Sequence, residues 1–92
     1  MKFQWDAHNR KKIAQHGITS REFEQAYAGR MLNEQKLVNR ERRKVAIGQT
    51  KSGRILLMVY TIRRGRVRAI TAYDSRKARA IWRTRKQANG NG

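Results

Sequence analysis

The spacing of hydrophobic positions changes about half-way along this chain. In the first part, apolar residues recur at three- and four-residue intervals, as in Phe23, Ala26 and Tyr27, which is the spacing of an amphipathic helix. From Lys44 onward the period changes to two, as in residues 44–49, which is typical of a strand with one buried face. The pattern therefore predicts an α+β chain whose first helices precede its sheet.

Two short helices are predicted near the N-terminus, because each has a recognisable start. Asp6 can cap a helix over residues 7–15, and Gly17 is placed to end it. Thr19 and Glu22 form the T-x-x-E pattern of a capping box, which predicts the start of a second helix directly afterwards. The two helices should therefore be joined by a sharp turn.

Three strands are predicted in the second part of the chain. Alternating or strongly apolar segments cover residues 44–49, 54–62 and 66–73. Residues 51–53 and the pair Arg64-Gly65 supply the turns between them. Because both connections are short, the three strands should be antiparallel.

The segments around these strands are less regular. Phe3 and Trp5 alternate with polar neighbours, which predicts a short strand or an extended anchor into the core, with Trp5 as a core aromatic. Residues 30–43 are rich in charge and predict a connection that can hold one edge strand.

A basic helix is predicted at the C-terminus. Asp74 or Ser75 can cap it, and it should run to about Arg85 with Trp82 turned inward. With 92 residues the chain fits one domain, expected over 1–86. The segment 87–92 has nothing to bury and should be a disordered tail.

The turn Arg64-Gly65 fixes an expected pairing of the last two strands, with Tyr60 opposite Ala69 and Met58 opposite Thr71. One sheet face should then be apolar and covered by the two helices: Ile55, Leu57, Val59, Ile70 and Ala72. The other face should be open and half polar: Arg54, Leu56, Met58, Tyr60, Thr71 and Tyr73. An arginine beside two tyrosines suits a phosphate and a stacked base.

The charge of the chain limits its partners. Lys and Arg number 23 against six Asp and Glu, which gives a formal net charge of +17. Residues 51–92 are the more basic part, because they contain a single acidic residue, Asp74. Such a surface repels itself and is stabilised by a polyanion, most commonly RNA or DNA, including the ribosome, or by an acidic protein. A purely solubilising surface is the plainer alternative.

Several kinds of site are disfavoured by the composition. The chain has no Cys, so disulfides and thiolate metal sites are excluded, and a reducing cytoplasm fits best. The longest apolar run, 55–60, is too short to cross a membrane. His8 and His16 lack the acidic neighbours of a metal site. We therefore expect a cytoplasmic protein without a metal, a cofactor or a membrane partner.

A series of short motifs resembles a known family in order and spacing. The main ones are Trp5-Asp6, His16-Gly17-Ile18-Thr19, Ile47-Gly48-Gln49-Thr50, Ser52-Gly53-Arg54 and Arg68-Ala69-Ile70-Thr71-Ala72. Over residues 3–85 the chain resembles the BrnT family of bacterial toxins, which are small ribonucleases of the RelE-like superfamily.

The resemblance implies a fold, an activity and partners. The implied RelE-like fold has two N-terminal helices on an antiparallel sheet of three to four strands, with a C-terminal helix. The implied activity is cleavage of mRNA, which inhibits translation, and the implied partners are RNA, the ribosome and a ribbon-helix-helix antitoxin. RelE-like enzymes generally use Arg and Lys to neutralise the phosphorane while a 2′-hydroxyl attacks the adjacent phosphate.

The chain departs from the family pattern at three positions. Tyr73 stands where the last strand typically carries Arg, and Ala78 and Trp82 stand where the last helix usually carries Glu and Tyr. Loss of the strand Arg can abolish catalysis, or Tyr73 and Arg79 can supply the site differently. A noncatalytic RNA- or ribosome-binding module is therefore the alternative to a ribonuclease, and a protein whose basic surface serves mainly its antitoxin is a third interpretation.

These considerations give two sets of candidate residues. The candidate catalytic residues are His16, Arg54, Tyr73 and Arg79. The candidate RNA-binding residues are Lys51, Tyr60, Arg66, Arg68, Arg76, Lys77 and Arg83. Structural alternatives remain for several of them: a strand end for Arg54, a capping role for His16, a turn for Lys51 and edge packing for both tyrosines. The basic face of the last helix is either solvated or a rail for the RNA backbone.

Overall fold

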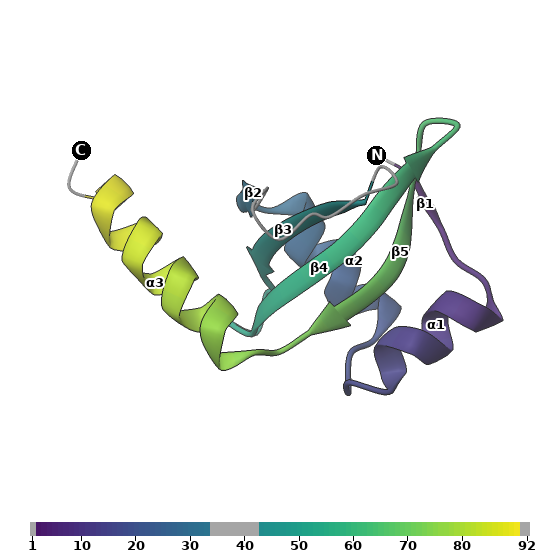
Figure 1. The fold of residues 1–92 in the computed structure, drawn as a ribbon, viewed down its shortest axis with the longest axis horizontal. Helices are drawn as coiled ribbons and strands as arrows, with labels where there is room; N and C mark the ends of the chain where they lie inside the picture. Colours follow the sequence, from purple (N-terminus) through teal and green to yellow (C-terminus); the bar gives the residue numbers. More distant parts are fainter. Residues whose placement is uncertain (1, 34–42, 91–92) are drawn as a thin grey trace.

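The computed structural model describes residues 2–33 and 43–90, with side chains as far as residue 85 (Figure 1). The rest of the connection expected at 30–43, namely 34–42, lies outside the described residues, as do Met1 and the last two residues. The elements are β1 (Lys2–Gln4), α1 (Ala7–Ala14), α2 (Ser20–Ala28), β2 (Met31–Asn33), β3 (Lys44–Gln49), β4 (Ile55–Arg63), β5 (Arg66–Tyr73) and α3 (Arg76–Gly90).

Both predicted helix starts are confirmed. At α1, Asp6 Oδ1 accepts a hydrogen bond from the Asn9 backbone N–H at 2.9 Å, and Asn9 Oδ1 accepts one from the Asp6 N–H at 2.8 Å. At α2, Thr19 and Glu22 exchange the equivalent bonds at 3.1 and 3.0 Å. Gly17 has a φ of 72°, in the left-handed region that glycine adopts at little cost, and the chain reverses there between the helices.

In the described part of the chain, the sheet has five strands in the order β1-β5-β4-β3-β2. β1 runs parallel to β5, whereas the other neighbours are antiparallel. The expectation of three to four antiparallel strands is therefore wrong in number and in the direction of the first strand. The two additional strands, β1 and β2, have three residues each. They lie where the sequence predicted a short strand or extended anchor around Phe3 and one edge strand within 30–43.

The pairing of β4 with β5 contains a bulge. Tyr60 faces Ala69 as predicted, but Val59 rather than Met58 faces Thr71. Ile70 is the extra residue, because the register shifts by one between the two pairs. From Thr71 onward, β5 therefore presents each side chain to the face opposite to the one that regular alternation would give.

The expected assignment of the two sheet faces is also wrong, because α1 and α2 cover the face that was expected to be open. Their shared core contains Ile13, Ile18, Phe23, Ala26, Ala46, Leu56, Met58, Tyr60, Val67, Ala69 and Ala72. Small residues explain this choice of face: a Cβ on Gly48 would lie 2.3 Å from the carbonyl oxygen of Ala26, so α2 approaches β3 closely. The apolar run of β4 supplies both faces, so hydrophobicity alone could not distinguish them.

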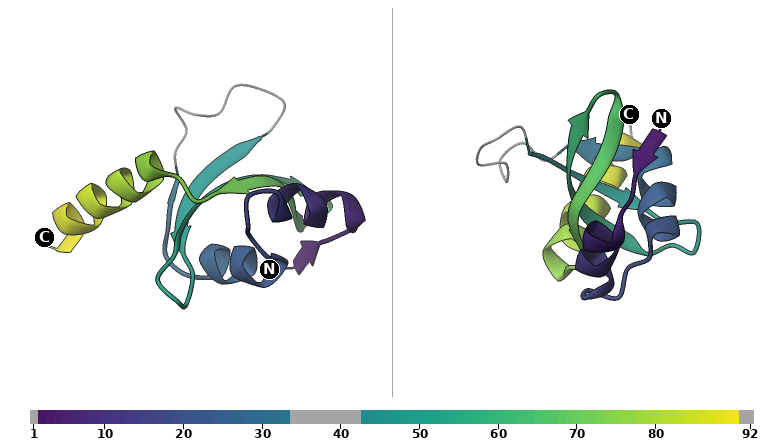
Figure 2. Two further views of the ribbon diagram at one scale, coloured as in Figure 1. Left: turned by 90° about the horizontal axis from the view of Figure 1, so that it is seen from below. Right: turned by 90° about the vertical axis from the view of Figure 1, so that its right-hand side faces the viewer.

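α3 packs on the opposite face of the sheet. Ala78 and Trp82 are buried against Ile47 and Ile55 of β3 and β4, which confirms Trp82 as a core aromatic. The helix continues to Gly90, past the expected end near Arg85 and into the stretch expected to be disordered. Its C-terminal half extends beyond the sheet, as the left view of Figure 2 shows.

Candidate functional site

Four segments meet at one corner of the molecule: the joint between α1 and α2, the start of β4, the end of β5 and the start of α3. They bring together all four candidate catalytic residues, His16, Arg54, Tyr73 and Arg79. Two acidic residues, Glu22 and Asp74, lie among them. We call these six residues the corner cluster.

Arg54 is the central member of the corner cluster, and its guanidinium group is hydrogen-bonded to other residues of the protein. Its Nε donates to Asp74 Oδ2 at 3.0 Å, and its Nη1 donates to the Gly17 carbonyl at 2.8 Å and to Glu22 Oε2 at 3.0 Å. Hydrogen bonds to Asp74 and Glu22 raise the pKa of Arg54. The guanidinium therefore joins the helical joint to the end of β5, and two carboxylates already balance its charge.

Asp74 connects Arg54 to Arg79. Its second oxygen, Oδ1, accepts a hydrogen bond from Arg79 Nη1, so one carboxylate serves two guanidinium groups. The hydrogen bond from Arg54 is the main reason why the pKa of Asp74 lies below its ordinary value. The helix cap was expected at Asp74 or Ser75, and Ser75 takes that role by accepting from the Ala78 N–H at 3.0 Å.

Glu22 contributes to the corner cluster from the first turn of α2. Partial burial raises its pKa, but hydrogen bonds from the Thr19 N–H and from Arg54 outweigh this and hold the pKa below its ordinary value. Sequence reasoning missed both carboxylates as site residues, because each already had a local explanation as a cap. For Asp74 there was one signal, its position as the single acidic residue of 51–92.

His16 and Tyr73 form the exposed part of the corner cluster. Their rings meet edge to face, with 4.5 Å between centroids and 66° between planes. Tyr73 is 37% exposed, and His16 is exposed as well. An imidazole can take up or release a proton near neutral pH, and a phenol can donate a hydrogen bond to a phosphate oxygen. The pair can thus supply acid–base chemistry at a solvent-facing position.

The sequence also matches a known family. A sequence model described as "Ribonuclease toxin, BrnT, of type II toxin-antitoxin system" matches residues 5–79, which include the whole corner cluster. The chain belongs to the BrnT family. Comparisons with curated proteins and with solved structures gave no match. As a BrnT ribonuclease toxin the chain has RNA as its substrate and an antitoxin as its partner.

One candidate RNA-binding residue of this BrnT chain is inaccessible. Tyr60 is only 4% exposed and packs edge to face on Tyr27 beneath α2, with ring centroids 5.2 Å apart. Burial, together with Tyr27, raises its pKa. Tyr60 therefore belongs to the core and offers no face to a base, contrary to the expectation that it lies on an open surface.

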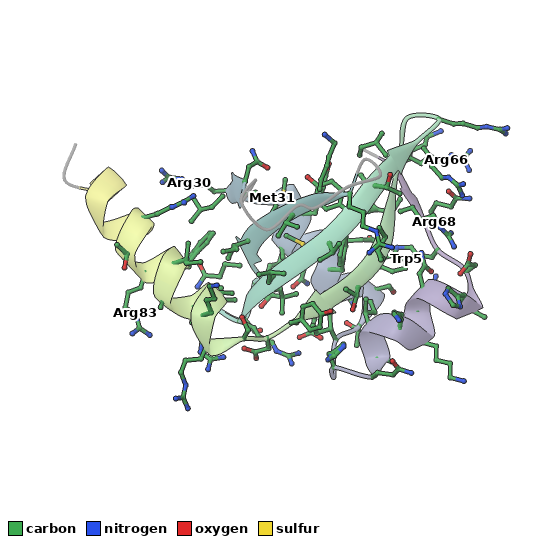
Figure 3. The ribbon with its side chains drawn as sticks, in the orientation of Figure 1. Trp5, Arg30, Met31, Arg66, Arg68 and Arg83 are labelled. Atoms are coloured by element: carbon green, nitrogen blue, oxygen red, sulfur yellow. The ribbon has the colours of Figure 1, made fainter. Side chains whose placement is uncertain are left out.

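The other candidate RNA-binding residues are spread over three places. Lys51 is exposed in the β3–β4 turn. Arg76, Lys77 and Arg83 are exposed along α3. Arg66 and Arg68 lie on β5 beside β1, at the end of the molecule opposite to Arg83 (Figure 3). Arg68 is engaged by Asp6, with 2.8 Å between Nη1 and Oδ2. The structure therefore does not gather this set into one surface.

Within residues 2–33 and 43–85, no three His, Cys, Asp or Glu side chains are grouped so that they could hold a metal ion. No described helix is long and apolar enough to span a membrane.

Proposed function

We propose that this BrnT chain cleaves mRNA at the corner cluster, in the cytoplasm, and thereby inhibits translation. The convergence of His16, Arg54, Tyr73 and Arg79 from four separate segments carries this proposal. The residues of an enzyme site come together in this way, whereas cations on a solvated surface need no common position.

Each residue takes a distinct part in the proposed cleavage. The 2′-oxygen attacks the adjacent phosphorus, a phosphorane forms, and the 5′-oxygen leaves, so the products carry a 2′,3′-cyclic phosphate and a 5′-hydroxyl. His16 takes the proton of the 2′-hydroxyl, and water supplies a proton to the departing 5′-oxygen. Tyr73 donates a hydrogen bond to a non-bridging oxygen of the phosphorane. Arg79, with a side chain 43% exposed, adds positive charge beside it.

Arg54 acts as a positioning residue in this scheme. Its bonds to the Gly17 carbonyl and to Asp74 fix the chain directly after His16 and directly after Tyr73. Holding both reacting groups in one geometry lowers the barrier without any contact between Arg54 and the substrate.

A second function is favoured by the same ion pairs. Glu22 and Asp74 balance the charges of Arg54 and Arg79, so much less positive charge is left for a phosphorane than in a cluster of free cations. Together with Tyr73 and Ala78 at positions where the family typically has other residues, this supports a noncatalytic module that binds RNA or the ribosome.

The partners and the fold family complete the proposal. A net charge of +17 favours an acidic antitoxin, which we propose to be of the ribbon-helix-helix type, and favours contact with the ribosome. The placement of α1 and α2 on one sheet face and α3 on the other supports a RelE-like single domain over residues 1–86.

Cleavage of a labelled mRNA by purified variants tests the proposal. His16→Ala and Tyr73→Phe should each lower the cleavage rate by about 10²-fold or more if the two side chains take part in proton transfer and charge stabilisation. His8→Ala is the matched control, because His8 is an exposed histidine of α1 outside the corner cluster. Circular dichroism checks that each variant is folded.

Induced expression separates the two functions in cells. A ribonuclease should arrest growth, and His16→Ala should restore it. If the folded wild-type protein binds RNA but leaves it intact, the noncatalytic module is the correct interpretation. If His8→Ala loses as much activity as His16→Ala, the corner cluster is not the site.

A further inference from the structure

Basic side chains lie in register at the end of the sheet far from the corner cluster. Lys2 of β1 pairs with Arg66 of β5, and Arg66 pairs with Arg63 of β4. Directly paired residues point to the same sheet face with neighbouring side chains, so this row places like charges side by side, which destabilises the free protein. Among the described residues, the ion pairs involve Arg54, Arg68 and Arg79, and none includes this row.

The hairpin turn adds a fourth cation under backbone strain. Arg64 has a φ of 51°, in the left-handed region where Gly, Asn and Asp are normally found, and Gly65 follows with a φ of 75°. A hollow of about 690 Å³ opens here, lined in the described part of the chain by Gln4, Ile62, Arg63, Arg64 and Arg66. We call Lys2, Arg63, Arg64 and Arg66 the hairpin row. Its charge repulsion is a cost that a bound polyanion would offset.

The bulge in β5 connects the hairpin row to the corner cluster. Val67 and Ala69 face the core under α1, so Arg66 and Arg68 point to the opposite face. Beyond the bulge Ala72 faces the same core, so Thr71 and Tyr73 join Arg66 and Arg68 on that opposite face. Without the extra residue, Thr71 and Tyr73 would point into the core. β5 therefore carries Arg66, Arg68 and Tyr73 on one face of a strand about 26 Å long, taken as eight residues of about 3.3 Å each, with the buried Thr71 between Arg68 and Tyr73.

We infer that the hairpin row binds backbone phosphates of the RNA whose scissile bond lies at the corner cluster, with β5 as the path between the two. The inference rests on the proposed function, because that places the reacting phosphate at Tyr73. Guanidinium groups bind phosphate through two parallel hydrogen bonds, so three neighbouring arginines suit consecutive phosphates. An RNA bound at the corner cluster must be long enough to span β5 before it reaches the hairpin row, whereas a very short RNA bound there does not reach it.

Binding of uncleavable RNA tests the inference. We would measure the affinity of 2′-O-methyl RNA, which lacks the attacking hydroxyl, at a length of about 16 nucleotides and of about 3 nucleotides. The test variant carries Arg63→Gln, Arg64→Gln and Arg66→Gln. The control carries Lys11→Gln, Lys12→Gln and Arg21→Gln, which remove the same charge from exposed positions on α1 and α2.

The length and salt dependence of affinity decide the outcome. With the long RNA, the test variant should bind at least about tenfold more weakly, and its log–log salt slope should fall by about 2, or about 0.7 for each lost phosphate contact. With the short RNA, the test variant and the wild type should bind alike. The control variant should keep most of the slope with the long RNA.

Three results would overturn the inference. One is an equal loss in the test and control variants, which would mean that net charge alone matters. Another is that the test variant binds the long RNA as tightly as the wild type does. The third is loss of antitoxin binding with RNA binding intact, which would make the hairpin row a protein-binding surface. Failure of the proposed function looks different: wild type would leave ordinary RNA uncleaved while these binding results stay as expected.

Discussion

Thr71 is a buried polar residue of β5. Its side chain is 93% buried, since 7% is exposed, and its hydroxyl has no hydrogen-bond partner among the described residues. The residue reaches this position because the bulge at Ile70 turns it to the face opposite to the core under α1. A buried hydroxyl without a partner costs free energy that an apolar side chain of the same shape does not.

Replacing Thr71 with Val should therefore stabilise the protein. The change keeps the shape of the side chain and removes the unsatisfied hydroxyl, so the free energy of unfolding should rise by about 1 kcal/mol. Urea denaturation followed by circular dichroism measures it. Thr61→Val, at a half-buried position of β4 on the same sheet face, is the control and should change stability less. Destabilisation by Thr71→Val would mean that the hydroxyl has a partner in solution.

Among the elements, the packing of α2 on β3 depends on one glycine. A Cβ at Gly48 would lie 2.3 Å from the backbone oxygen of Ala26, which cannot move without moving the helix. By contrast, a Cβ at Gly29, just after α2, would meet its nearest atom at 3.7 Å, an ordinary van der Waals contact.

Gly48→Ala should therefore displace α2 and lower the free energy of unfolding by about 2–3 kcal/mol, as overpacked cores do. The matched change Gly29→Ala should lower it by clearly less. Denaturation midpoints of the two variants decide the matter. Equal midpoints would indicate that α2 is not held against β3 as closely as the structure places it.

The elements with local signals could be predicted from the sequence. Asp6 and the Thr19–Glu22 pair marked the helix starts, and Arg64-Gly65 marked the hairpin. The bulge at Ile70 has no local signal, because an extra residue in an apolar strand looks like any other position. The faces of the sheet were predicted the wrong way round for a related reason: β4 is apolar on both sides, and the choice depends on how closely α2 can approach.

The candidate site was predictable only in part. Arg54 and Tyr73 were predicted from the strand pattern, His16 from the chemistry of its imidazole group and Arg79 through the family resemblance. The structure places all four together. That Arg54 is held by two carboxylates is a tertiary contact between residues 20 and 32 positions apart, and no spacing rule reports it.

At the scale of the whole molecule, the corner cluster makes the stability of the folded protein depend on pH. The pKa values of Glu22 and Asp74 are below their ordinary values in the folded protein, so the folded state binds fewer protons than the unfolded state in this range. Their contribution to the free energy of unfolding is therefore fully present at pH values above the ordinary carboxyl pKa. It is lost as the pH falls through the lowered pKa values of the folded protein. The melting temperature should be level near neutral pH and fall below about pH 4.

Asp74→Asn tests this dependence. The variant should be less stable than wild type at pH 7, because Arg54 and Arg79 lose a charged partner, and the difference should shrink as the pH falls below about 4. Thermal unfolding at several pH values measures both effects. A difference that stays constant over the whole range would show that the carboxylate charge of Asp74 does not contribute.

The parallel pairing of β1 with β5 joins the first and the last of the described strands. During synthesis the N-terminus emerges first, so β1 waits without its partner until Arg66–Arg68 have been made, and the proposed site waits longer, for Tyr73 and Arg79. A nascent chain that has not reached these residues would thus lack the proposed site, and a prematurely terminated product would stay without it. We expect a fragment ending at residue 72 to leave cell growth unchanged. Competence would arrive only after Tyr73 and Arg79 have been made, which gives an antitoxin already present the chance to bind each new molecule as it folds.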